Sequence, residues 1–247
     1  MRTRAFLVLL VLVSGPALAG DEVTVAVASN FSRAAAEIAA QFADETGIKV
    51  RISNGSTGKL YAQILNGAPF DVFLAADAER PTLLEQSGHA VSGSRITYAV
   101  GALVLWSGVA NDCLAVLGDE HGGRVALANP QTAPYGKAAI EYLSAEGVWD
   151  SVSRLAVYGE NINQALQFVA TGNAAIGFIA KSQLAAPQLP KATCTWELPA
   201  SSHSSLEQQA VLLARAADNE GAQRFLDYLG STAAHEILTR HGYGVSW

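Results

Sequence analysis

The chain repeats one local pattern four times: a short apolar run rich in β-branched residues, a few small polar residues, and then a stretch with helical character. The first copy is VAVASNFSRAAAEIAAQF (25–42), whose apolar half ends at the pair Ser29 and Asn30. The other copies begin at residues 50, 124 and 154. Strands that alternate with helices in this way predict an α/β architecture with mostly parallel strands.

A weak internal repeat relates these units. Residues 63–75 (QILNGAPFDVFLA) align without gaps on residues 168–180 (FVATGNAAIGFIA), an offset of 105 positions. The same offset pairs Asn30 with Tyr135 and Ser56 with Asn161, which are the polar starts of helices. Chance similarity between helix–glycine–strand units is the alternative explanation. We interpret the repeat as two similar lobes that face each other, each giving two helix N-termini to a shared cleft.

The boundaries of the two lobes depend on where the chain is expected to pass from one lobe to the other. Two-lobed binding proteins commonly cross between lobes more than once, and we place the crossings near Tyr98–Gly101 and near Pro199. The first lobe then contains residues 20–98 and 200–247, and the second contains residues 99–199. The C-terminal part indicates a strand in 208–217 and a helical segment in 221–243, which we expect to pack on the first lobe.

Residues 1–19 have the features of a secretory signal peptide. Arg2 and Arg4 precede an apolar run of nine residues (5–13), which is too short for the about 20 residues that span a bilayer. The segment 17–19, Ala-Leu-Ala, has the small-x-small form of a cleavage site. A buried N-terminal strand is the alternative. Cleavage near Ala19 predicts an exported, periplasmic protein.

The charge balance excludes one class of partner. The chain has 16 basic and 22 acidic residues, a formal net charge of −6, and removal of the two leader arginines makes it −8. No basic stripe exists to neutralise phosphates, so nucleic acid is not an expected partner. We expect a monomer.

The two cysteines, Cys113 and Cys194, lie in no spacing that is typical of metal ligands. An oxidising compartment allows a disulfide between them. Two separate buried thiols are the alternative, and the sequence does not decide between these states.

The N-termini of the predicted helices provide the candidate binding groups. The first N–H groups of a helix have no intrahelical partner, and the helix dipole adds partial positive charge, so converging starts would form an anion site. Each residue alone could be an ordinary N-cap. Their place at the carboxyl ends of strands, where α/β sheets bind ligands, favours a binding site. We expect Ser29 and Asn30 to offer a hydroxyl and a carboxamide, and Pro134 at the first helical position to leave the Tyr135 and Gly136 N–H groups free. The candidate ligand residues are Ser29, Asn30, Ser56, Tyr135 and Ile162, followed by Thr57 and Asn161.

The capping positions contain no Arg, His or carboxylate, which narrows the ligand. A fully ionised oxyanion needs only donors, whereas hydrogen phosphate also needs an acceptor for its proton. A donor-only site therefore favours sulfate, molybdate or tungstate. The candidate residues would hold the metal as an oxyanion, without direct metal ligands and without a cofactor.

Other functional classes have weaker support. GxSxG, HExxH, P-loop and dinucleotide-binding motifs are absent, and the five histidines are scattered, so we do not expect an enzyme. A carboxylate or phosphate ligand is often bound by Arg, and no motif supplies one. A sensor domain that docks rather than delivers remains an alternative.

Six blocks of the chain together resemble the periplasmic molybdate-binding proteins of ABC importers. The blocks are VAVASNFSRAAAEIAAQF, SNGSTGKLYAQILNGAPFDVFLAAD, RITYAVGALVLWS, ANPQTAPYGKAAIEYL, GENINQALQFVATGNAAIGFIA and ILTRHGYG, and they span essentially the whole mature chain. The resemblance implies a two-lobed type II periplasmic binding protein that holds molybdate or tungstate in the interlobe cleft and delivers it to a membrane permease. The alternative is another tetrahedral oxyanion such as sulfate.

The resemblance also implies roles for individual residues. By motif, the Ser29–Asn30 pair occupies the first binding position and Ser56 the second, while Tyr135 and Ile162 contribute largely through backbone N–H groups. Some members place a tyrosine hydroxyl in the site from the position of Ala180 in this chain. We expect Tyr135 to compensate for this missing tyrosine hydroxyl.

Overall fold

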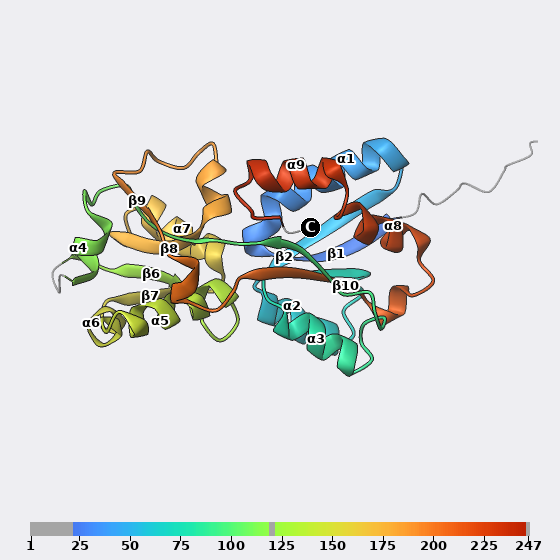
Figure 1. Ribbon diagram of the computed structural model, residues 1–247, viewed down its shortest axis with the longest axis horizontal. Coiled ribbons are helices and arrows are strands. Elements are labelled where there is room, and N and C mark those ends of the chain that lie inside the picture. Colours follow the sequence, from blue (N-terminus) through green and yellow to red (C-terminus); the bar gives the residue numbers. More distant parts are fainter. Residues whose placement is uncertain (1–21, 119–121, 246–247) are drawn as a thin grey trace, which may run out of the picture.

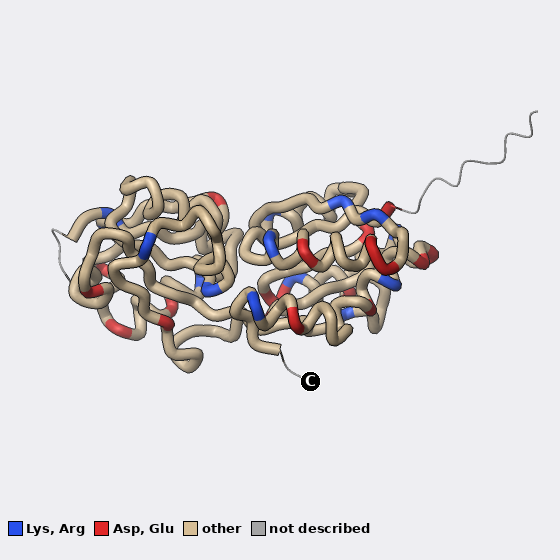
Figure 2. Tube along the Cα trace, turned by 90° about the horizontal axis from the view of Figure 1, so that it is seen from above, with Lys and Arg blue, Asp and Glu red and all other residues tan. Residues whose placement is uncertain are grey.

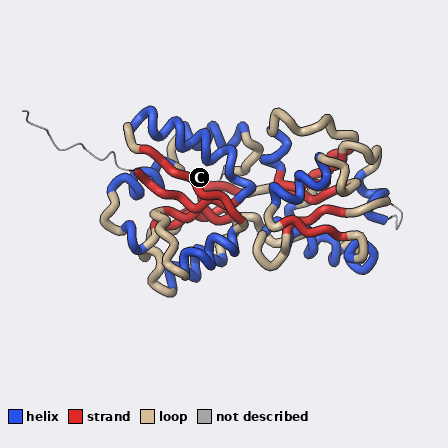
Figure 3. Tube along the Cα trace, turned by 180° about the vertical axis from the view of Figure 1, so that it is seen from behind, coloured by secondary structure: helices blue, strands red, loops and turns tan. Residues whose placement is uncertain are grey.

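The computed structural model describes residues 22–118 and 122–245 and shows two α/β bodies side by side along the long axis (Figure 1). Each body contains one five-stranded sheet with helices on both faces (Figure 3). We call the body that contains the first strand the first lobe and the other the second lobe. The predicted signal peptide lies outside the described residues.

The sheet of the first lobe has the strand order β2-β1-β3-β10-β4. β1 pairs in parallel with β2 and β3, and β10 pairs antiparallel with β3 and β4. Four of the five strands therefore run in one direction, as predicted for a mostly parallel sheet. The strands are β1 (Glu22–Ala28), β2 (Lys49–Gly55), β3 (Val72–Ala75), β4 (Ile96–Val100) and β10 (Glu207–Leu212).

Two hydrophobic cores cover the faces of this sheet. Alternate residues of a strand point to opposite faces, so Val25 of β1 packs under α1, α8 and α9, while Ala26 packs against α2 and α3. The apolar spacing of the helices buries one side of each against the sheet. The helical elements of this lobe are η1 (Ser29–Phe31), α1 (Ser32–Thr46), α2 (Thr57–Leu65), α3 (Glu79–Gln86), η4 (Ala214–Ala216), α8 (Glu220–Tyr228) and α9 (Thr232–Arg240).

The second lobe repeats this architecture with the strand order β7-β6-β8-β5-β9. β6 pairs in parallel with β7 and β8, and β5 pairs antiparallel with β8 and β9. The strands are β5 (Leu103–Ser107), β6 (Val125–Ala128), β7 (Ala156–Gly159), β8 (Ile176–Ala180) and β9 (Cys194–Glu197). The helical elements are α4 (Cys113–Gly118), α5 (Pro134–Ala145), α6 (Trp149–Ser153), α7 (Ile162–Ala170), η2 (Lys181–Ala185) and η3 (Ala200–Ser202).

The internal repeat is confirmed by this correspondence. The offset of 105 positions carries the bounds of α2 onto those of α7. It also pairs Gly67 with Gly172, and both adopt the left-handed conformation that glycine tolerates, with φ of 81° and 76°. The two lobes are therefore two copies of one strand–helix plan.

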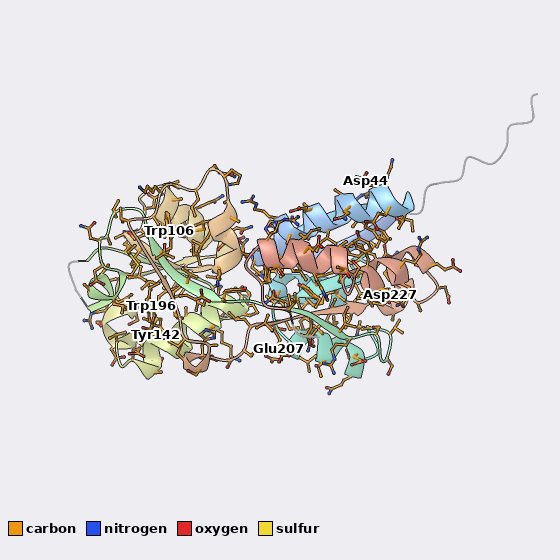
Figure 4. The ribbon with its side chains drawn as sticks, turned by 45° about the horizontal axis from the view of Figure 1, so that its top comes forward. Asp44, Trp106, Tyr142, Trp196, Glu207 and Asp227 are labelled. Atoms are coloured by element: carbon orange, nitrogen blue, oxygen red, sulfur yellow. A yellow bond between two sulfur atoms is a disulfide. The ribbon has the colours of Figure 1, made fainter. Side chains whose placement is uncertain are left out.

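The chain crosses between the lobes twice. The first crossing joins β4 to β5, and the second joins β9 to β10 through η3; Glu207, at the start of β10, lies at the junction of the two bodies (Figure 4). The crossings touch, because the Gly101 N–H donates to the Leu206 carbonyl at 2.9 Å. η3 contacts α5, the Ser204 N–H donates to Glu141 at 2.7 Å, and Leu206 joins the core of the second lobe.

Cys113 and Cys194 form a disulfide that ties the start of α4 to the start of β9. Their Cα atoms are 5.7 Å apart, within the range that disulfides require. The ring of Trp196, two residues beyond Cys194, lies 5.7 Å from that of Tyr142, and both belong to the second lobe (Figure 4). Of the two alternatives for the cysteines, the structure therefore has the bonded pair.

The C-terminal prediction was right in placement but wrong in two boundaries. The strand ends at Leu212 rather than continuing to residue 217, because η4 follows it. Residues 221–243 contain two helices instead of one continuous segment. The Ser231 hydroxyl accepts from the Ala234 N–H at 3.1 Å and begins α9 as a new helix. Both helices pack on the first lobe, as expected.

Candidate functional site: a pocket between the lobes

A small pocket lies between the lobes and gathers the predicted site residues from both. Its cavity volume is about 10 Å³, and none of the described residues that line it carries a charged side chain. Pockets for drug-sized organic ligands are larger, about 300–1,000 Å³. The size and neutrality of the pocket suit a small inorganic ion. The lining consists of Ser29, Asn30, Ser56, Thr57, Tyr135, Asn161 and Ile162 together with Ala28, Ala76, Ala133 and Pro134.

Ser56 is the N-cap residue of α2, but its hydroxyl does not cap the helix. The residue is 3% exposed, and its Oγ has no hydrogen-bond partner among the described residues. Leaving a buried polar group unpaired costs about 1–3 kcal/mol. An unpaired hydroxyl that faces a lined pocket is therefore a group that a ligand can satisfy.

Thr57 follows Ser56 and shows a different use of its hydroxyl. Its Oγ1 accepts a hydrogen bond from the Ala76 N–H at 3.1 Å and so ties α2 to the end of β3. The Thr57 N–H is the first of the helix and has no intrahelical partner. Thr57 can therefore contribute its backbone to a ligand while its side chain serves the fold.

Asn30 differs from the expectation that its carboxamide donates to the ligand. Its Nδ2 donates to Gln208 Oε1 at 2.7 Å and to the Tyr243 hydroxyl at 3.0 Å. A carboxamide has two N–H hydrogens, and both are used inside the protein. Only the backbone N–H of Asn30 remains as a donor at the start of η1. The neighbouring Ser29 hydroxyl forms no hydrogen bond within the described chain and lines the pocket.

Asn161 is an ordinary N-cap in the structure. Its Oδ1 accepts from the Asn163 and Gln164 N–H groups at 3.0 and 3.1 Å. The Ile162 N–H, the first of α7, is left without an intrahelical partner at the pocket wall. The second lobe thus offers the backbone of Ile162 rather than the side chain of Asn161.

Tyr135 is buried at the first turn of α5, after Pro134 at the N1 position. The Gly136 N–H was expected to be free, but it donates to the Ala133 carbonyl at 2.9 Å, so the Tyr135 N–H is the remaining donor. The Tyr135 hydroxyl lies beside Asn30 without a hydrogen bond of ordinary geometry. It also lies against Gly101, where an added Cβ would approach the hydroxyl oxygen to 2.1 Å.

Burial and the neighbouring Tyr243 hydroxyl raise the pKa of Tyr135 well above its usual value, so the hydroxyl is neutral at physiological pH. Because the hydroxyl lies against Gly101 at the first crossing, the group that Tyr135 can offer to a ligand is its backbone N–H. Glycine at position 101 leaves room for the hydroxyl end of the Tyr135 ring, whereas any side chain there would collide with it.

The lobes are in contact around the pocket, which makes this the closed arrangement. The Gly58 N–H donates to the Thr132 carbonyl at 2.8 Å, and a Cβ at Gly58 would lie 2.9 Å from the Thr132 Cα. The Lys59 Nζ is 3.0 Å from a Glu160 carboxylate oxygen. Arg80 donates to the Gln131 carbonyl at 3.3 Å. Glycine at position 58 therefore permits the backbones of the two lobes to meet beside the site.

The described residues contain neither a metal-ligand cluster nor a candidate membrane span. These described residues contain no cluster of three His, Cys, Asp or Glu side chains that could hold a metal ion. Lys and Arg are dispersed among Asp and Glu over both lobes (Figure 2). Within the described ranges, no helix has the length and apolar character needed to cross a membrane.

Four residues that support the site were missed by sequence reasoning. Thr132 meets α2 across the cleft, and Ser182, Gln208 and Tyr243 surround Asn30. No local pattern marks them, because each acts through a partner that is distant in sequence. Tyr243 lies in the closing block ILTRHGYG, one of the six blocks that carry the family resemblance.

Comparison with known proteins agrees with this geometry. The model of the bacterial extracellular solute-binding protein family matches residues 23–244. The molybdate-binding protein ModA of Azotobacter vinelandii is 46% identical over 227 residues, which cover 91% of this chain and 90% of that protein. ModA of Rhodobacter capsulatus is 44% identical over 247 residues, covering 97% and 96%.

A solved structure shares the fold. The periplasmic molybdate-binding protein of Azotobacter vinelandii superposes with a TM-score of 0.85 at 36% identity, covering 91% of this chain and all of that one. The sequence-based predictions of a two-lobed binding-protein fold, and of a binding protein rather than an enzyme, are confirmed. The chain belongs to the bacterial extracellular solute-binding proteins and, among them, to the molybdate-binding proteins.

Proposed function

We propose that this chain captures molybdate, and equally tungstate, outside the cytoplasm and delivers it to the permease of an ABC transporter. The observation that carries the proposal is the Ser56 hydroxyl, which is buried and unpaired in a small uncharged pocket between two lobes. The names of the relatives support the identity of the anion. A cleaved signal peptide ending near Ala19, a periplasmic location, a monomeric state and the absence of a cofactor belong to the same proposal.

The groups proposed to bind the anion are those that the fold leaves without a hydrogen-bond partner at the pocket. We propose that the anion accepts hydrogen bonds from the Ser29 and Ser56 hydroxyls and from first-turn N–H groups. The backbone donors are those of Asn30, Thr57, Tyr135 and Ile162. Charge-assisted hydrogen bonds in a site shielded from water are stronger than the same bonds in water. No carboxylate or imidazole lines the pocket to accept the proton of hydrogen phosphate.

Closure of the lobes supplies the binding mechanism. Four of the six proposed donors come from the first lobe and two from the second, so an open form presents only part of the site. We propose that the lobes move about the two touching crossings, one at Gly101–Ala102 and the other near Leu206. We keep the predicted division into two lobes as a proposal, with the first crossing moved from 98/99 past Val100, the end of β4, and the return crossing moved from 199/200 toward Leu206, because η3 packs on α5. Gly58 and Thr132 then meet only in the closed form.

Size is expected to separate molybdate from sulfate, the second candidate ligand. Both are tetrahedral dianions, but molybdate and tungstate have longer metal–oxygen bonds. Helix ends set in packed cores do not shrink onto a smaller anion. Each donor left unpaired costs about 1–3 kcal/mol, so two or three losses amount to roughly two to six orders of magnitude in affinity.

Calorimetry with molybdate, tungstate, sulfate and phosphate at neutral pH tests the proposal. Tight and similar binding of the first two, with weak or undetectable binding of the others, is the expected result. Native mass spectrometry of the protein as purified should show a bound heavy-metal oxyanion. Displacement of molybdate by sulfate at comparable concentration would refute the size argument and favour the second ligand.

A further inference from the structure

Asn30 is held from behind the pocket by three buried residues that come from distant parts of the chain. Gln208 lies on β10, Tyr243 follows α9, and Ser182 lies in η2 of the second lobe. In addition to the two bonds of Nδ2, the Asn30 carbonyl accepts from Ser182 Oγ at 3.0 Å and from the Tyr243 hydroxyl at 2.8 Å. None of the three partners lines the pocket.

The directions of the carboxamide hydrogen bonds are determined by the network itself. Gln208 Nε2 donates to the Leu206 carbonyl at 2.8 Å, so Gln208 Oε1 is the end that accepts from Asn30. Burial raises the pKa of Tyr243, and its hydroxyl therefore stays protonated and can donate. Each hydrogen of the Asn30 carboxamide has one acceptor. The network leaves one orientation for this side chain.

The partners of Asn30 are also attached to the crossings between the lobes. The pairing of β10 with β4 shifts register between Gln208 and Gln209, and such bulges re-aim side chains next to functional sites. Gly244, beside Tyr243, exchanges two backbone hydrogen bonds with Val100 at 2.7 and 2.8 Å, just before the first crossing. The support of Asn30 is thus built where a hinge motion would be centred.

We propose that Tyr243, Gln208 and Ser182 are positioning residues of the anion site. They hold the peptide groups of η1 so that the Asn30 N–H and the Ser29 hydroxyl face the ligand, and Ser182 completes the network only when the second lobe has closed. The inference rests on the proposed function and deepens it. A site made of backbone donors depends on peptide orientation, and η1 spans only residues 29–31.

The chain contains a matched control for the Tyr243 hydroxyl. The rings of Tyr98 and Tyr243 both pack on Phe31, with centroids 4.8 and 5.4 Å away. Both hydroxyls are buried, but that of Tyr98 has no hydrogen-bond partner among the described residues, whereas that of Tyr243 has three contacts, to Asn30 and Ser182. Tyr98→Phe and Tyr243→Phe therefore remove the same atom from similar surroundings.

Calorimetric titration of the ligand-free proteins with sodium molybdate is the first test. Tyr243→Phe should bind about tenfold more weakly than the wild type, and Tyr98→Phe within about twofold of it. Equal affinities for Tyr243→Phe and the wild type, or equal losses in both variants, would overturn the proposal. A wild-type chain that binds none of the four oxyanions would instead refute the proposed function.

Ser182→Ala is the second test and remains informative if Tyr243→Phe does not fold. Because the Ser182 bond exists only in the closed form, its loss should speed molybdate release about tenfold and leave the association rate unchanged. Stopped-flow association and chase experiments measure both rates. A slower association with unchanged release would contradict a role in closure, as would unchanged values of both.

Discussion

The two lobes share a strand order and a repeat offset, yet their equivalent N-cap residues use their side chains in opposite ways. Asn161 bonds two N–H groups of its own helix, whereas the Ser56 hydroxyl bonds nothing and stays buried. The first lobe therefore presents hydroxyls as well as backbone N–H groups at the pocket, while the second presents backbone N–H groups. The same local plan can serve fold stability in one copy and ligand binding in the other.

The lobes also differ in how their folds are stabilised. The Cys113–Cys194 disulfide belongs to the second lobe, while no other cysteine exists in the chain. The first lobe relies on its two packed cores and on the helices that return at the C-terminus. Variants that act on one lobe at a time can separate stability from binding.

Loss of the disulfide is expected to have the largest effect. Replacement of both cysteines by alanine opens a loop with a sequence separation of 81 residues and should lower the free energy of unfolding by about 2–4 kcal/mol. Denaturant titration measures this loss. Molybdate affinity should change little, because neither cysteine lines the pocket. Equal unfolding free energies, or two alkylated thiols in protein isolated without reductant, would contradict the expectation.

Ser56→Ala should separate binding from stability most clearly. The variant loses a hydrogen bond to a charged ligand, so we expect molybdate binding to weaken by about 1.5–3 kcal/mol. The ligand-free protein loses no existing bond, and its thermal midpoint should not fall. Calorimetry and a thermal scan of the same sample give both values. Unchanged affinity would remove Ser56 from the ligand set.

Asn161→Ala tests the opposite case, in which the N-cap side chain stabilises the fold more than it supports ligand binding. Loss of an N-cap costs about 0.5–2 kcal/mol, and this loss should appear in the unfolding free energy of the ligand-free protein. Binding should weaken less than in Ser56→Ala, because the Ile162 N–H remains in place. If Asn161→Ala reduced affinity more than stability, the contrast between the two caps would be wrong.

The smallest expected effect concerns the ion pair across the cleft. Lys59 and Glu160 are 47% and 67% exposed, and such pairs contribute about 0–1 kcal/mol. A double-mutant cycle with Lys59→Gln and Glu160→Gln should give a coupling in this range for molybdate binding, and it should decrease with added salt. A coupling above that range, or one insensitive to salt, would mean that the ion pair is one of the main contacts that hold the two lobes together.

Several parts of the site could be predicted from local sequence alone. Strand ends and helix starts are encoded within a few residues, by apolar runs, small polar residues and prolines such as Pro134. The repeat offset then related Ser56 to Asn161 without any structure. These features are local, so the sequence could indicate all seven candidate residues that the fold then brings to one pocket.

The hydrogen-bond partners of each polar group could not be predicted in the same way. The partners of Asn30 are separated from it by 152 to 213 positions, and nothing in the segment around Asn30 indicates them. The carboxamide expected at the ligand was therefore bonded elsewhere. The Gly136 N–H likewise went to a neighbouring carbonyl in the turn before α5.

Local sequence is sufficient to predict the alternation of strands and helices, the duplicated plan and the set of polar residues at the helix starts. Which donors remain free for an anion depends on the folded chain. Each polar group has a fixed number of hydrogen bonds to make. Distant residues such as Gln208 and Tyr243 compete for the bonds of Asn30, whereas no residue in the described chain competes for the hydroxyl of Ser56.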